Sequence, residues 1–591
     1  FIRESRPFIF KTSMGSRTQI GEDIDGESAN DGSGTSLSLS SDGSVVAIGA
    51  QYNDGNGNDS GHVRIYQYAN DSWIKLGDDI DGEVHGDRSG YSVSLSSDGS
   101  FVAIGAYAND GNGNDSGHVR IYQYTNDSWT QIGQDIDGEA VGDQSGYSVS
   151  LSSDGSIVAI GSAENNENGN DSGHVRIYQF DSDSNAWSQL GQDIDGESSY
   201  DYSGGSVSLS ADGTVVAIGA AYNDENGKNS GHVRIYQYDG ENWEQLGEDI
   251  DGEAAGDGSG WSVDLSDDGS IVAIGANSND GNGDRSGHVR IYQFSNDNGT
   301  WNQIGDDIDG EAAEDASGYS VSLSSDGSIV AIGAPGNDGN GATSGHVRIY
   351  QYANDSWTKL GDDIDAEAAG DFSGSSVSLS ADGSVVAIGA PSNDGNGSNS
   401  GHVRIYQNDG LTWNQIGNDI DGEAANDYSG FSVSLSDDGS VLAIGATGNA
   451  LGNVFYGNIG ENEIFGLDGN DALFGNNGND RLFGNVGSDT SFGGQGSDTI
   501  YGNQDSDFIY GNQDNDLLYG GQGDDVLFGG QGNDAIFGDN GNDRLNGNLG
   551  DDSLTGGEGA DTFIFTGRFG NDVITDFSAE DGDQIVVSQP N

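Results

Sequence analysis

Between residues 16 and 456, hydrophobic and polar positions follow a pattern that repeats every 56 or 58 residues, as from Ile24 to Ile80 and from Ile136 to Ile194. One unit reads SGYSVSLSSDGS, FVAIGAYANDGNGNDSG, HVRIYQYTNDSW and TQIGQDIDGEAVGD. The first piece alternates like a half-buried strand, and FVAIGA is continuously apolar like a strand buried on both faces. HVRIYQY alternates again, and the stretch from the tryptophan through TQIGQDI predicts a fourth strand. Four short antiparallel strands per repeat predict the blades of an all-β propeller.

The number of strands sets the expected size of the ring. The first, second and fourth strands each occur eight times, whereas SGHVRIYQ occurs seven times. Where an eighth copy is expected, residues 451–457 read LGNVFYG, and we interpret them as a degraded copy with Val454 and Tyr456 pointing inward. TQIGEDI near the N-terminus then supplies the outermost strand of the last blade. We expect eight blades over residues 16–456, with seven as the alternative, after an N-terminal tail at residues 1–15.

From Gly457 onwards the period changes to nine residues. In twelve successive repeats the first position is glycine, the sixth is aspartate or, once, Asn462, and the eighth is apolar except for Ser491. Glycine permits tight turns, and the apolar residue anchors a short strand in a core. If two repeats make one coil, each aspartate faces the matching turn one coil along. Such carboxylates repel one another unless a cation lies between them, and ligand sets made only of oxygen favour Ca²⁺.

The sixth-position aspartates are therefore the predicted ligands of several calcium ions. They are Asp471, Asp480, Asp489, Asp498, Asp507, Asp516, Asp525, Asp534, Asp543, Asp552 and Asp561.

The nonapeptide block resembles the RTX, or hemolysin-type, calcium-binding repeats, whose motif GGxGxDxUx is closely matched by GGQGDDVLF and GGQGNDAIF. The resemblance implies a parallel β-roll over residues 457–563. It also implies type I secretion with an uncleaved C-terminal signal, because GADTFIFTGRFGNDVITDFSAEDGDQIVVS is similar to the segment that follows such repeats. We therefore expect residues 564–591 to form a flank with a secretion signal. Asp505 and Asp514 replace the fourth glycine of the motif, and near them and Ser491 we expect weaker calcium sites.

The longer repeat resembles the FG-GAP, or integrin-α-like, propeller repeats at SGYSVSLS, VAIGAP and GHVRIY. The calcium loop of that family, D-x-D-x-D-G between the first two strands, is absent, because the turn here is only SSDGS. The resemblance therefore implies the propeller fold but no calcium site in that turn.

Two acidic loops of the propeller are candidate sites. The DIDGE loop offers Asp79, Asp81, Glu83 and Asp87 in one repeat, and it is either a calcium site on the rim or an acidic surface turn between blades. The NDGNG loop at residues 53–57 has a variable polar position in its equivalents, which makes it a plausible ligand-contact surface. That position is occupied by Lys228, Asp284, Ala342 and Ser398 in four blades.

Seven histidines recur once per repeat, each followed two residues later by arginine. Because an active site breaks symmetry, we expect these residues to be structural, with the arginines pairing to aspartates between blades. We also expect the repeated tryptophans, from Trp73 to Trp413, to pack rather than to stack on sugars, whereas Trp261 lies outside that series and is the better binding candidate. The histidines are His62, His118, His174, His232, His288, His346 and His402.

The sequence contains no G-x-S-x-G, H-E-x-x-H, Walker or sialidase Asp-box motif, and we expect no catalysis. Its 98 acidic and 19 basic side chains give a formal net charge of −79, which excludes nucleic acid and anionic membrane surfaces as partners. Cysteine is absent, and no apolar run is long enough for a transmembrane segment or an N-terminal signal.

We expect a secreted or cell-surface calcium-binding protein whose propeller mediates adhesion or recognition of an extracellular glycan or protein. The alternatives are a structural component of a surface layer or matrix, and a secreted hydrolase built on the propeller.

Overall fold

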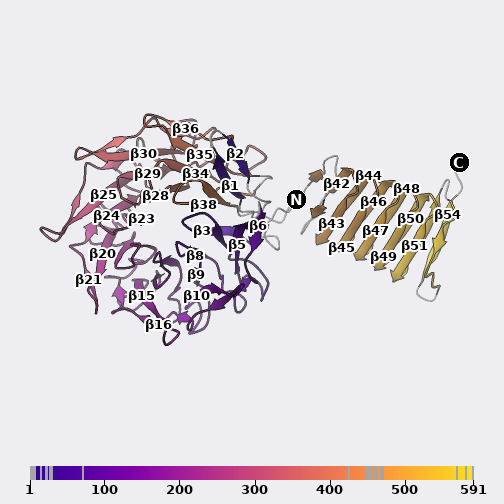
Figure 1. Cartoon of the computed structure of the whole chain (residues 1–591), viewed down its shortest axis with the longest axis horizontal. Coiled ribbons are helices and arrows are strands. Elements are labelled where there is room, and N and C mark those ends of the chain that lie inside the picture. Colours follow the sequence, from indigo (N-terminus) through magenta and orange to yellow (C-terminus); the bar gives the residue numbers. More distant parts are fainter. Residues whose placement is uncertain are drawn as a thin grey trace. The chain divides into compact units, whose positions relative to one another are not determined.

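The computed structural model describes residues 8–13, 16–19, 24, 31–69, 72–422, 426–446, 454–456, 463–465, 472–486, 488–566, 570–579 and 582–588. They form strands, turns and loops in two compact units whose boundary falls between residues 448 and 449. Over these residues, no helix is long and apolar enough to cross a membrane. The expected all-β chain, a propeller followed by a parallel roll, is confirmed (Figure 1).

A complete blade is an antiparallel sheet of five strands from one contiguous segment. In one blade these are β8 (Ser92–Leu95), β9 (Phe101–Ala106), β10 (His118–Thr125), β11 (Ser128–Gln131) and β12 (Ile136–Asp137). The order is β11-β10-β9-β8, and β12 pairs with β10 beyond the end of β11. The predicted fourth strand is thus two short strands, and its second part carries the DIDGE motif.

Six further blades repeat this order. Their two inner strands are β3 (Ser33–Leu39) and β4 (Val45–Ala50), β13 (Ser148–Leu151) and β14 (Ile157–Ser162), β18 (Ser206–Leu209) and β19 (Val215–Ala220), β23 (Ser262–Leu265) and β24 (Ile271–Ala276), β28 (Ser320–Leu323) and β29 (Ile329–Ala334), and β33 (Ser376–Leu379) and β34 (Val385–Ala390). The third strands are β5 (His62–Ala69), β15 (His174–Asp181), β20 (His232–Tyr238), β25 (His288–Ser295), β30 (His346–Ala353) and β35 (His402–Asn408).

The outer strands of these blades are β6 (Ser72–Lys75), β16 (Ala186–Gln189), β21 (Trp243–Gln245), β26 (Thr300–Gln303), β31 (Ser356–Lys359) and β36 (Trp413–Gln415). The DIDGE strands are β7 (Ile80–Asp81), β17 (Ile194–Asp195), β22 (Ile250–Asp251), β27 (Ile308–Asp309), β32 (Ile364–Asp365) and β37 (Ile420–Asp421).

The core of the propeller lies between neighbouring blades. Val119 and Ile121 of β10 pack in one cluster with Val158, Ile160 and Trp187 of the next blade. The second strand of each blade is apolar on both faces because it is covered from both sides. Its residues are also small because backbones come close there: a Cβ added to Gly105 would lie 2.2 Å from the carbonyl oxygen of Gly146 in the next blade.

Polar side chains also tie the blades together. The Trp187 indole is buried and donates to the Ile132 carbonyl of the preceding blade at 2.9 Å, so it is a packing residue as expected. Arg120 donates to the main-chain carbonyl of Asp81 in the preceding blade at 2.6 Å. Arg176, Arg234, Arg290, Arg348 and Arg404 make the same contact, so these arginines do tie neighbouring blades together, but through the aspartate backbone rather than through the predicted pairing with its carboxylate.

The ring closes through the N-terminal segment. The sheet of β38 (Ser432–Leu435) and β39 (Val441–Gly445) is completed by β1 (Phe8–Ser13) and β2 (Ser16–Gln19). β38 lies between the inner strands β33 and β3, so this sheet takes its own place in the ring (Figure 1). Among the described residues, seven blades are each one contiguous segment, and this four-stranded composite sheet is the eighth.

Two expectations about this closure are wrong. The segment Phe8–Ser13 is not a tail outside the ring, because Ile9 and Phe10 pair with Ala443 and Leu442 as Ile121 and Tyr122 pair with Ala103 and Val102 in a complete blade. The segment FIFKT thus takes the place that RIYQY has in a complete blade. The strand β2, which contains the start of TQIGEDI, is the outermost strand of this sheet, as predicted. LGNVFYG is not a blade strand, because β40 (Val454–Tyr456) pairs in parallel with a strand of the roll.

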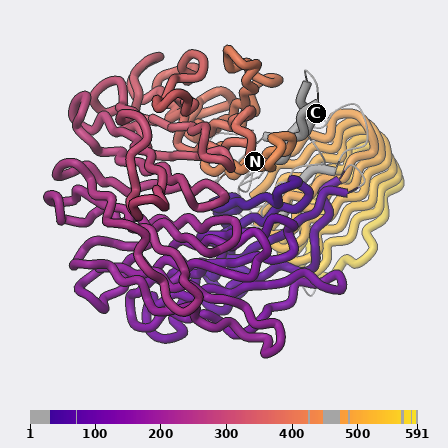
Figure 2. Tube along the Cα trace, turned by 60° about the vertical axis from the view of Figure 1, so that its left-hand side comes forward, coloured from indigo at the N-terminus to yellow at the C-terminus, as the bar shows by residue number. Residues whose placement is uncertain are grey.

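The roll consists of two parallel sheets in which each strand pairs with the strand two repeats away, so two repeats make one coil (Figure 2). One sheet contains β40, β42 (Ala472–Asn477), β44 (Thr490–Gln495), β46 (Phe508–Gln513), β48 (Val526–Gln531), β50 (Arg544–Leu549), β52 (Thr562–Thr566) and β54 (Gln584–Ser588). The other contains β41 (Glu463–Phe465), β43 (Arg481–Val486), β45 (Thr499–Gln504), β47 (Leu517–Gln522), β49 (Ala535–Asn540), β51 (Ser553–Glu558) and β53 (Val573–Ile574).

The eighth position of each repeat fills the core between the two sheets. These side chains are fully buried and form a single cluster, which confirms the predicted role of the apolar position. They are Leu473, Leu482, Ile500, Ile509, Leu518, Leu527, Ile536, Leu545, Leu554 and Phe563.

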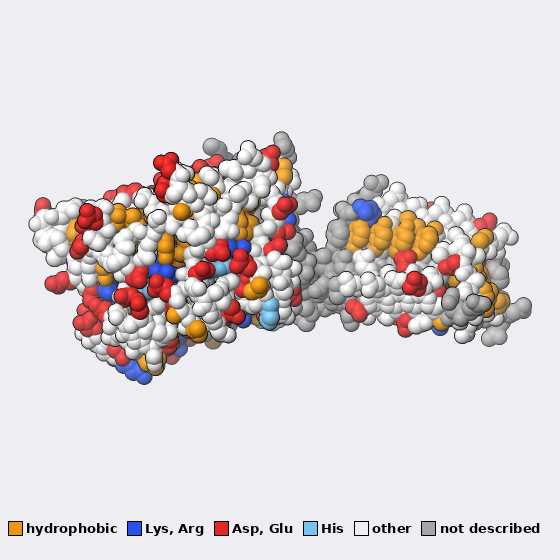
Figure 3. Space-filling model, turned by 90° about the horizontal axis from the view of Figure 1, so that it is seen from below, with side chains coloured by type: hydrophobic (Ala, Val, Ile, Leu, Met, Phe, Trp, Pro, Cys, Tyr) orange, Lys and Arg blue, Asp and Glu red, His pale blue; other side chains and the backbone are white. Residues whose placement is uncertain are grey.

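The ninth position forms an aromatic row on each sheet of the roll. Successive rings stack with centroids 4.8–5.0 Å apart and planes within 13° of parallel. Figure 3 shows hydrophobic side chains gathered in such a row on the surface of the roll. The rows are Phe474, Phe492, Tyr510 and Phe528 on one sheet, and Phe483, Tyr501, Tyr519 and Phe537 on the other.

Candidate calcium sites and a propeller cavity

The sixth-position aspartates form two ladders along the roll. Asp471 lies outside the described residues, and the other ten are at most 3% exposed. In each rung one carboxylate oxygen accepts the backbone N–H of the aspartate one coil before. Asp525 Oδ1, for example, accepts from Asp507 at 2.8 Å, and Asp543 Oδ1 accepts from Asp525 at 2.8 Å. The structure therefore brings the predicted ligands into register, one coil apart.

The second oxygen of each carboxylate is available for another partner. Oδ2 is buried and has no hydrogen-bond partner in Asp498, Asp507, Asp516, Asp525, Asp534, Asp543, Asp552 and Asp561. Buried polar oxygens are almost always satisfied, so a row of unsatisfied ones indicates a missing positive partner. A hard divalent cation that prefers oxygen ligands meets this requirement, and these carboxylates therefore fit calcium.

Burial also shifts the ionisation of the ladder. Desolvation, with a contribution from neighbouring aspartates, raises the pKa of Asp507, Asp516 and Asp543 to about 8. Desolvation likewise raises the pKa of Asp525 and Asp534 to about 6. Without a cation these groups thus favour the protonated state well above the usual range for aspartate.

The first glycine of each repeat has a different role from the one expected. We predicted that it permits a tight turn, but Gly520 lies within β47, and a Cβ there would be 2.4 Å from Asp525 Oδ2. The glycine is required because the carboxylate of its own repeat lies over it. The turn conformation is adopted by the second and fourth positions, as in Gly521 and Gly523 with φ of 107° and 132°.

Two ligand candidates escaped the sequence analysis. Asp572 Oδ1 accepts the N–H of Asp552 at 3.1 Å, and Asp583 Oδ1 accepts that of Asp561 at 3.0 Å, so each ladder continues by one rung. They stand 20 and 22 residues after their partners and therefore break the nine-residue period. The sequence feature that could have identified them is the triplet of aspartate, any residue and an apolar residue that the repeats also contain. It reads DVI at residues 572–574 and DQI at residues 583–585. Part of the predicted C-terminal flank is thus the last coil of the roll.

The structure also describes the turns at which we predicted weaker calcium sites. Asp505 and Asp514 adopt φ of 68° and 72°, where the motif normally places glycine, and their charges contribute to the raised pKa of Asp507 and Asp516. Ser491 occupies the core position and is buried. Weaker calcium binding at these turns stays a prediction.

Replacing the glycine under a ladder carboxylate tests this geometry. In Gly529→Ala, the new Cβ would lie 2.3 Å from Asp534 Oδ2 and 2.8 Å from the carbonyl oxygen of Gly547. We expect the carboxylate to be displaced and the calcium concentration at half-folding to rise at least tenfold, about 1.4 kcal/mol. A calcium titration followed by circular dichroism measures this. Gln531→Ala, an exposed change in the same strand, is the control, and equal midpoints for both variants would contradict the assignment.

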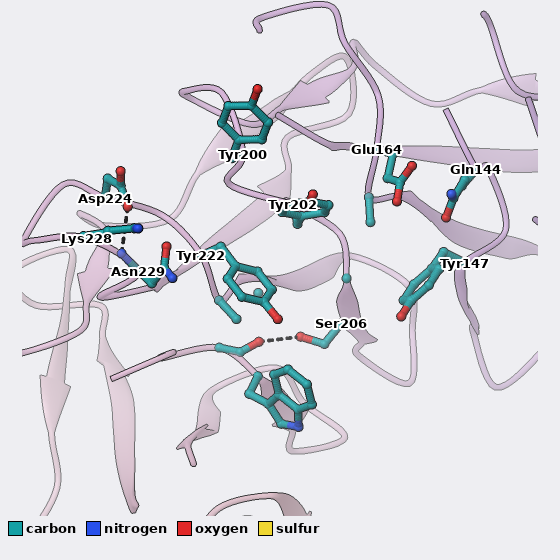
Figure 4. A pocket seen from close by; sticks show the side chains of 16 residues that line it. Gln144, Tyr147, Glu164, Tyr200, Tyr202, Ser206, Tyr222, Asp224, Lys228 and Asn229 are labelled. Carbon is teal, nitrogen blue, oxygen red and sulfur yellow. Dashed lines mark hydrogen bonds between the residues drawn. The ribbon is translucent and has the colours of Figure 1, made fainter. Parts of the chain in front are cut away.

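The propeller contains a cavity of about 770 Å³ that spans three blades and is bounded by the ends of β13, β18 and β23. Part of its lining, including Tyr222, Lys228 and Trp261, stands at positions whose residue changes from blade to blade. Tyr222 packs against Tyr202 with ring centroids 5.3 Å apart (Figure 4). Trp261, the predicted binding candidate, lines the same cavity and is 41% exposed. Glu164 and Lys228 provide charges of opposite sign.

A second cavity of about 640 Å³ shares Tyr222 and Trp261 and adds Arg285 and Tyr319. Of the variable residues predicted in the NDGNG loops, Lys228 lines the first cavity, whereas Asp284, Ala342 and Ser398 line neither. The tyrosines escaped the sequence analysis because their positions hold a different residue in most of the blades, and comparison of the repeats position by position would have revealed them.

The DIDGE acids do not form one ligand set. Asp87 accepts the N–H groups of Glu83 and Val84 and so holds its own turn, and Asp79 pairs with Lys75 at 2.5 Å. Glu83 Oε2 instead lies 4.0 Å from Nδ1 of His118 in the next blade. These contacts favour the acidic surface turn over a calcium site within this one loop, and the side chains that meet come from neighbouring blades.

Comparison with known families agrees with both repeat types. A model of the RTX calcium-binding nonapeptide repeat matches residues 447–574 in overlapping copies, and a model of the FG-GAP repeat matches residues 194–236 and 365–406. Among curated proteins, none is significantly similar to this chain.

Solved structures are similar to this chain only at low identity. The periplasmic gluconolactonase PpgL of Pseudomonas aeruginosa is 14% identical over 62% of this chain and 96% of its own, with a TM-score of 0.40. Sqt1 of Saccharomyces cerevisiae is 12% identical over 71% of this chain and 97% of its own, with a TM-score of 0.42. At this level of similarity nothing follows about activity. The identity of the chain rests on its repeats: it is a protein of RTX calcium-binding nonapeptide repeats preceded by a propeller with FG-GAP repeats.

Proposed function

We propose that this protein is an extracellular recognition protein without catalytic activity, in which calcium folds the roll and the propeller binds a glycan. The observation that carries the recognition role is the cavity around Trp261. Its residues Trp261, Tyr222 and Lys228 stand at positions whose residue differs between otherwise repeated blades. In repeat proteins, such variation on a constant scaffold is typical of a binding face.

The chemistry of the cavity favours a saccharide. Aromatic rings such as Trp261, Tyr222 and Tyr202 offer apolar faces on which a sugar ring can lie, while Glu164 and Gln144 offer hydrogen bonds to hydroxyl groups. A net charge of −79 disfavours polyanionic glycans, so the ligand we propose is a neutral one.

A glycan array tests this proposal with a matched pair of variants. Phe431 occupies the position of Trp261 in another blade, is similarly exposed and lines neither cavity. We expect Trp261→Ala to reduce binding about fivefold, since stacking on one aromatic ring contributes about 1 kcal/mol. Phe431→Ala is expected to bind like the unchanged protein. Equal binding by both variants, or an array of glycans and matrix proteins with no bound member, would contradict the proposal.

A second candidate is a structural component of a surface layer or matrix. The two stacked aromatic rows of the roll favour it, because half-buried rings in register are suited to contact with another surface. Light scattering distinguishes the two candidates: calcium-driven ordered self-association of the purified protein supports the structural role, and a calcium-loaded monomer supports recognition.

We further propose that the protein is exported through a type I secretion system and that residues 564–591 contain the secretion signal. In low cytosolic calcium the aspartates of the ladder repel one another and keep the segment of the roll extended. Calcium outside the cell neutralises them, and the folded roll cannot return through the exporter. Deletion of residues 564–591 is expected to abolish export from a host carrying such an exporter. Because this deletion also removes Asp572 and Asp583, the variant Asp572→Asn Asp583→Asn is the control and should be exported normally. Truncated protein in the medium at the full-length level would contradict the mechanism.

A further inference from the structure

Histidine and carboxylate side chains meet at the boundaries between blades. Each cluster combines the histidine that begins a third strand, the first aspartate of the DIDGE segment in the same blade, and the DIDGE glutamate of the preceding blade. In Glu83, His118 and Asp135, for example, one ligand atom from each residue lies within 4.8 Å of the others. Figure 3 shows acidic side chains gathered around the few basic ones on one side of the propeller.

Among the described residues, two of these clusters contain a fourth ligand, which the clusters of His118, His288 and His346 lack. Glu167 and Glu225 stand where five blades have a glycine in the NDGNG loop, and each joins the cluster of its blade. The glycines are Gly55, Gly111, Gly281, Gly339 and Gly395. The two four-residue clusters are Glu139, Glu167, His174 and Asp193, and Glu197, Glu225, His232 and Asp249.

The histidines at the base of these two clusters have unsatisfied ring nitrogens. His174 and His232 are fully buried, and neither nitrogen of either ring has a hydrogen-bond partner. Buried polar atoms are rarely left in this state.

A histidine–carboxylate distance in the second of these clusters is too long for a hydrogen bond but suits a shared ion. His232 Nδ1 lies 3.9 Å from Glu197 Oε2. Two atoms that are each about 2.0–2.2 Å from one zinc ion lie at most about 4.4 Å apart. The neighbouring arginines leave this oxygen free: Arg234 Nη1 lies 3.7 Å from the other oxygen of Glu197, and its Nη2 donates to the Asp195 carbonyl at 2.6 Å.

We propose that each of the two four-residue clusters binds one divalent first-row transition-metal ion through an imidazole nitrogen and carboxylate oxygens. The nitrogen ligand distinguishes these sites from the oxygen-only ladder of the roll, because imidazole suits zinc and its neighbours whereas calcium takes oxygen. Each ion also joins two blades, since Glu139 and Glu197 come from the blades that precede those of His174 and His232.

Zinc binding to the full chain tests the proposal when calcium is present in large excess to occupy the roll. Isothermal titration calorimetry should give two zinc ions per chain. Glu167→Gly and Glu225→Gly each reproduce the loop of the other blades, so they should fold, and each should weaken one site at least tenfold. Gly111→Glu should create a third site, since the φ of Gly111 is not in the left-handed region. Glu164→Gln, which removes an acid of the same loop outside the cluster, should retain both sites.

Cobalt absorption provides a second readout, because the intense visible bands of Co²⁺ distinguish a protein-bound ion of low coordination number from the hydrated ion. The visible bands of bound Co²⁺ should weaken by about half in Glu167→Gly and disappear in Glu167→Gly Glu225→Gly. If that double variant binds zinc as tightly as the unchanged protein, or if excess calcium releases the zinc, the proposal is wrong.

Discussion

Removal of calcium from the intact protein is expected to unfold the roll while the propeller stays folded. The roll buries ten described aspartates of its repeats in two ladders, and most of their Oδ2 atoms have no hydrogen-bond donor. Ionising several such carboxylates without a cation costs on the order of a few kcal/mol each, whereas a domain's whole stability is about 5–15 kcal/mol. The propeller core is instead apolar and continuous between blades, and it does not depend on such charges.

The pH dependence of the roll without calcium should run opposite to ordinary acid denaturation. The folded-state pKa of Asp507, Asp516 and Asp543 is about 8, above the ordinary value of 3.8. Their protonation therefore stabilises the fold fully below about pH 4, and this stabilisation is lost as the pH rises towards 8. In chelator, the roll should gain structure on acidification. With calcium, acidification should weaken binding, because protons compete for the same oxygens.

Hydrogen exchange read by mass spectrometry measures both effects on the full chain. In chelator near pH 8, amides of β44 to β51 should exchange within seconds, and they should become protected when calcium is added or when the pH is lowered towards 4. The amides of β9, β14 and β19 serve as the internal control and should remain protected with and without calcium. Protected roll amides in chelator near pH 8 would show that the ladder does not need a cation.

Asp525→Asn is expected to change the stability of the roll in opposite directions with and without calcium. Asparagine retains an oxygen that can accept the N–H of Asp507, a bond of 2.8 Å in the unchanged protein, but it removes a charge that burial makes costly. In chelator the variant should therefore be more stable. With calcium, a lost carboxylate ligand should raise the calcium concentration at half-folding at least tenfold, about 1.4 kcal/mol.

Asp524→Asn makes the same change of charge one residue away and serves as the control. The Asp524 carboxylate is exposed and accepts from Asn542 at 2.8 Å, a bond that asparagine can also accept. We expect little effect on either measurement. Calcium titrations of the unchanged protein and the two variants, followed by circular dichroism, measure the effect on calcium binding. Thermal unfolding of the same three proteins in chelator measures the effect on stability without calcium. If Asp525→Asn were destabilised in chelator as well, the carboxylate would be a structural hydrogen-bonding group rather than a calcium ligand.

The periodic part of the architecture was predictable because its signals are local. Alternation in SVSL and HVRIYQ, and the apolar run VAIGA, are properties of single strands, and each became a strand of a blade. The nine-residue period likewise fixes which aspartates are neighbours, since strands two repeats apart pair residue for residue, as Val526 does with Arg544. From period and residue type alone, the roll, its core and ten of its described ligand candidates follow.

The non-periodic features required the tertiary structure, because they depend on contacts between residues that are distant in the sequence. FIFKTS reads as a short isolated stretch until β1 pairs with β39 at the other end of the propeller segment. That Gly520 makes room for Asp525 depends on where the coil places a carboxylate. Glu139 and His174 belong to different blades, and Tyr147, Tyr222 and Trp261 to three of them. Local sequence determined the strands and the ladder of acids; only the closing of the ring, which brings separate blades together, decided which side chains share the cavity and the metal clusters.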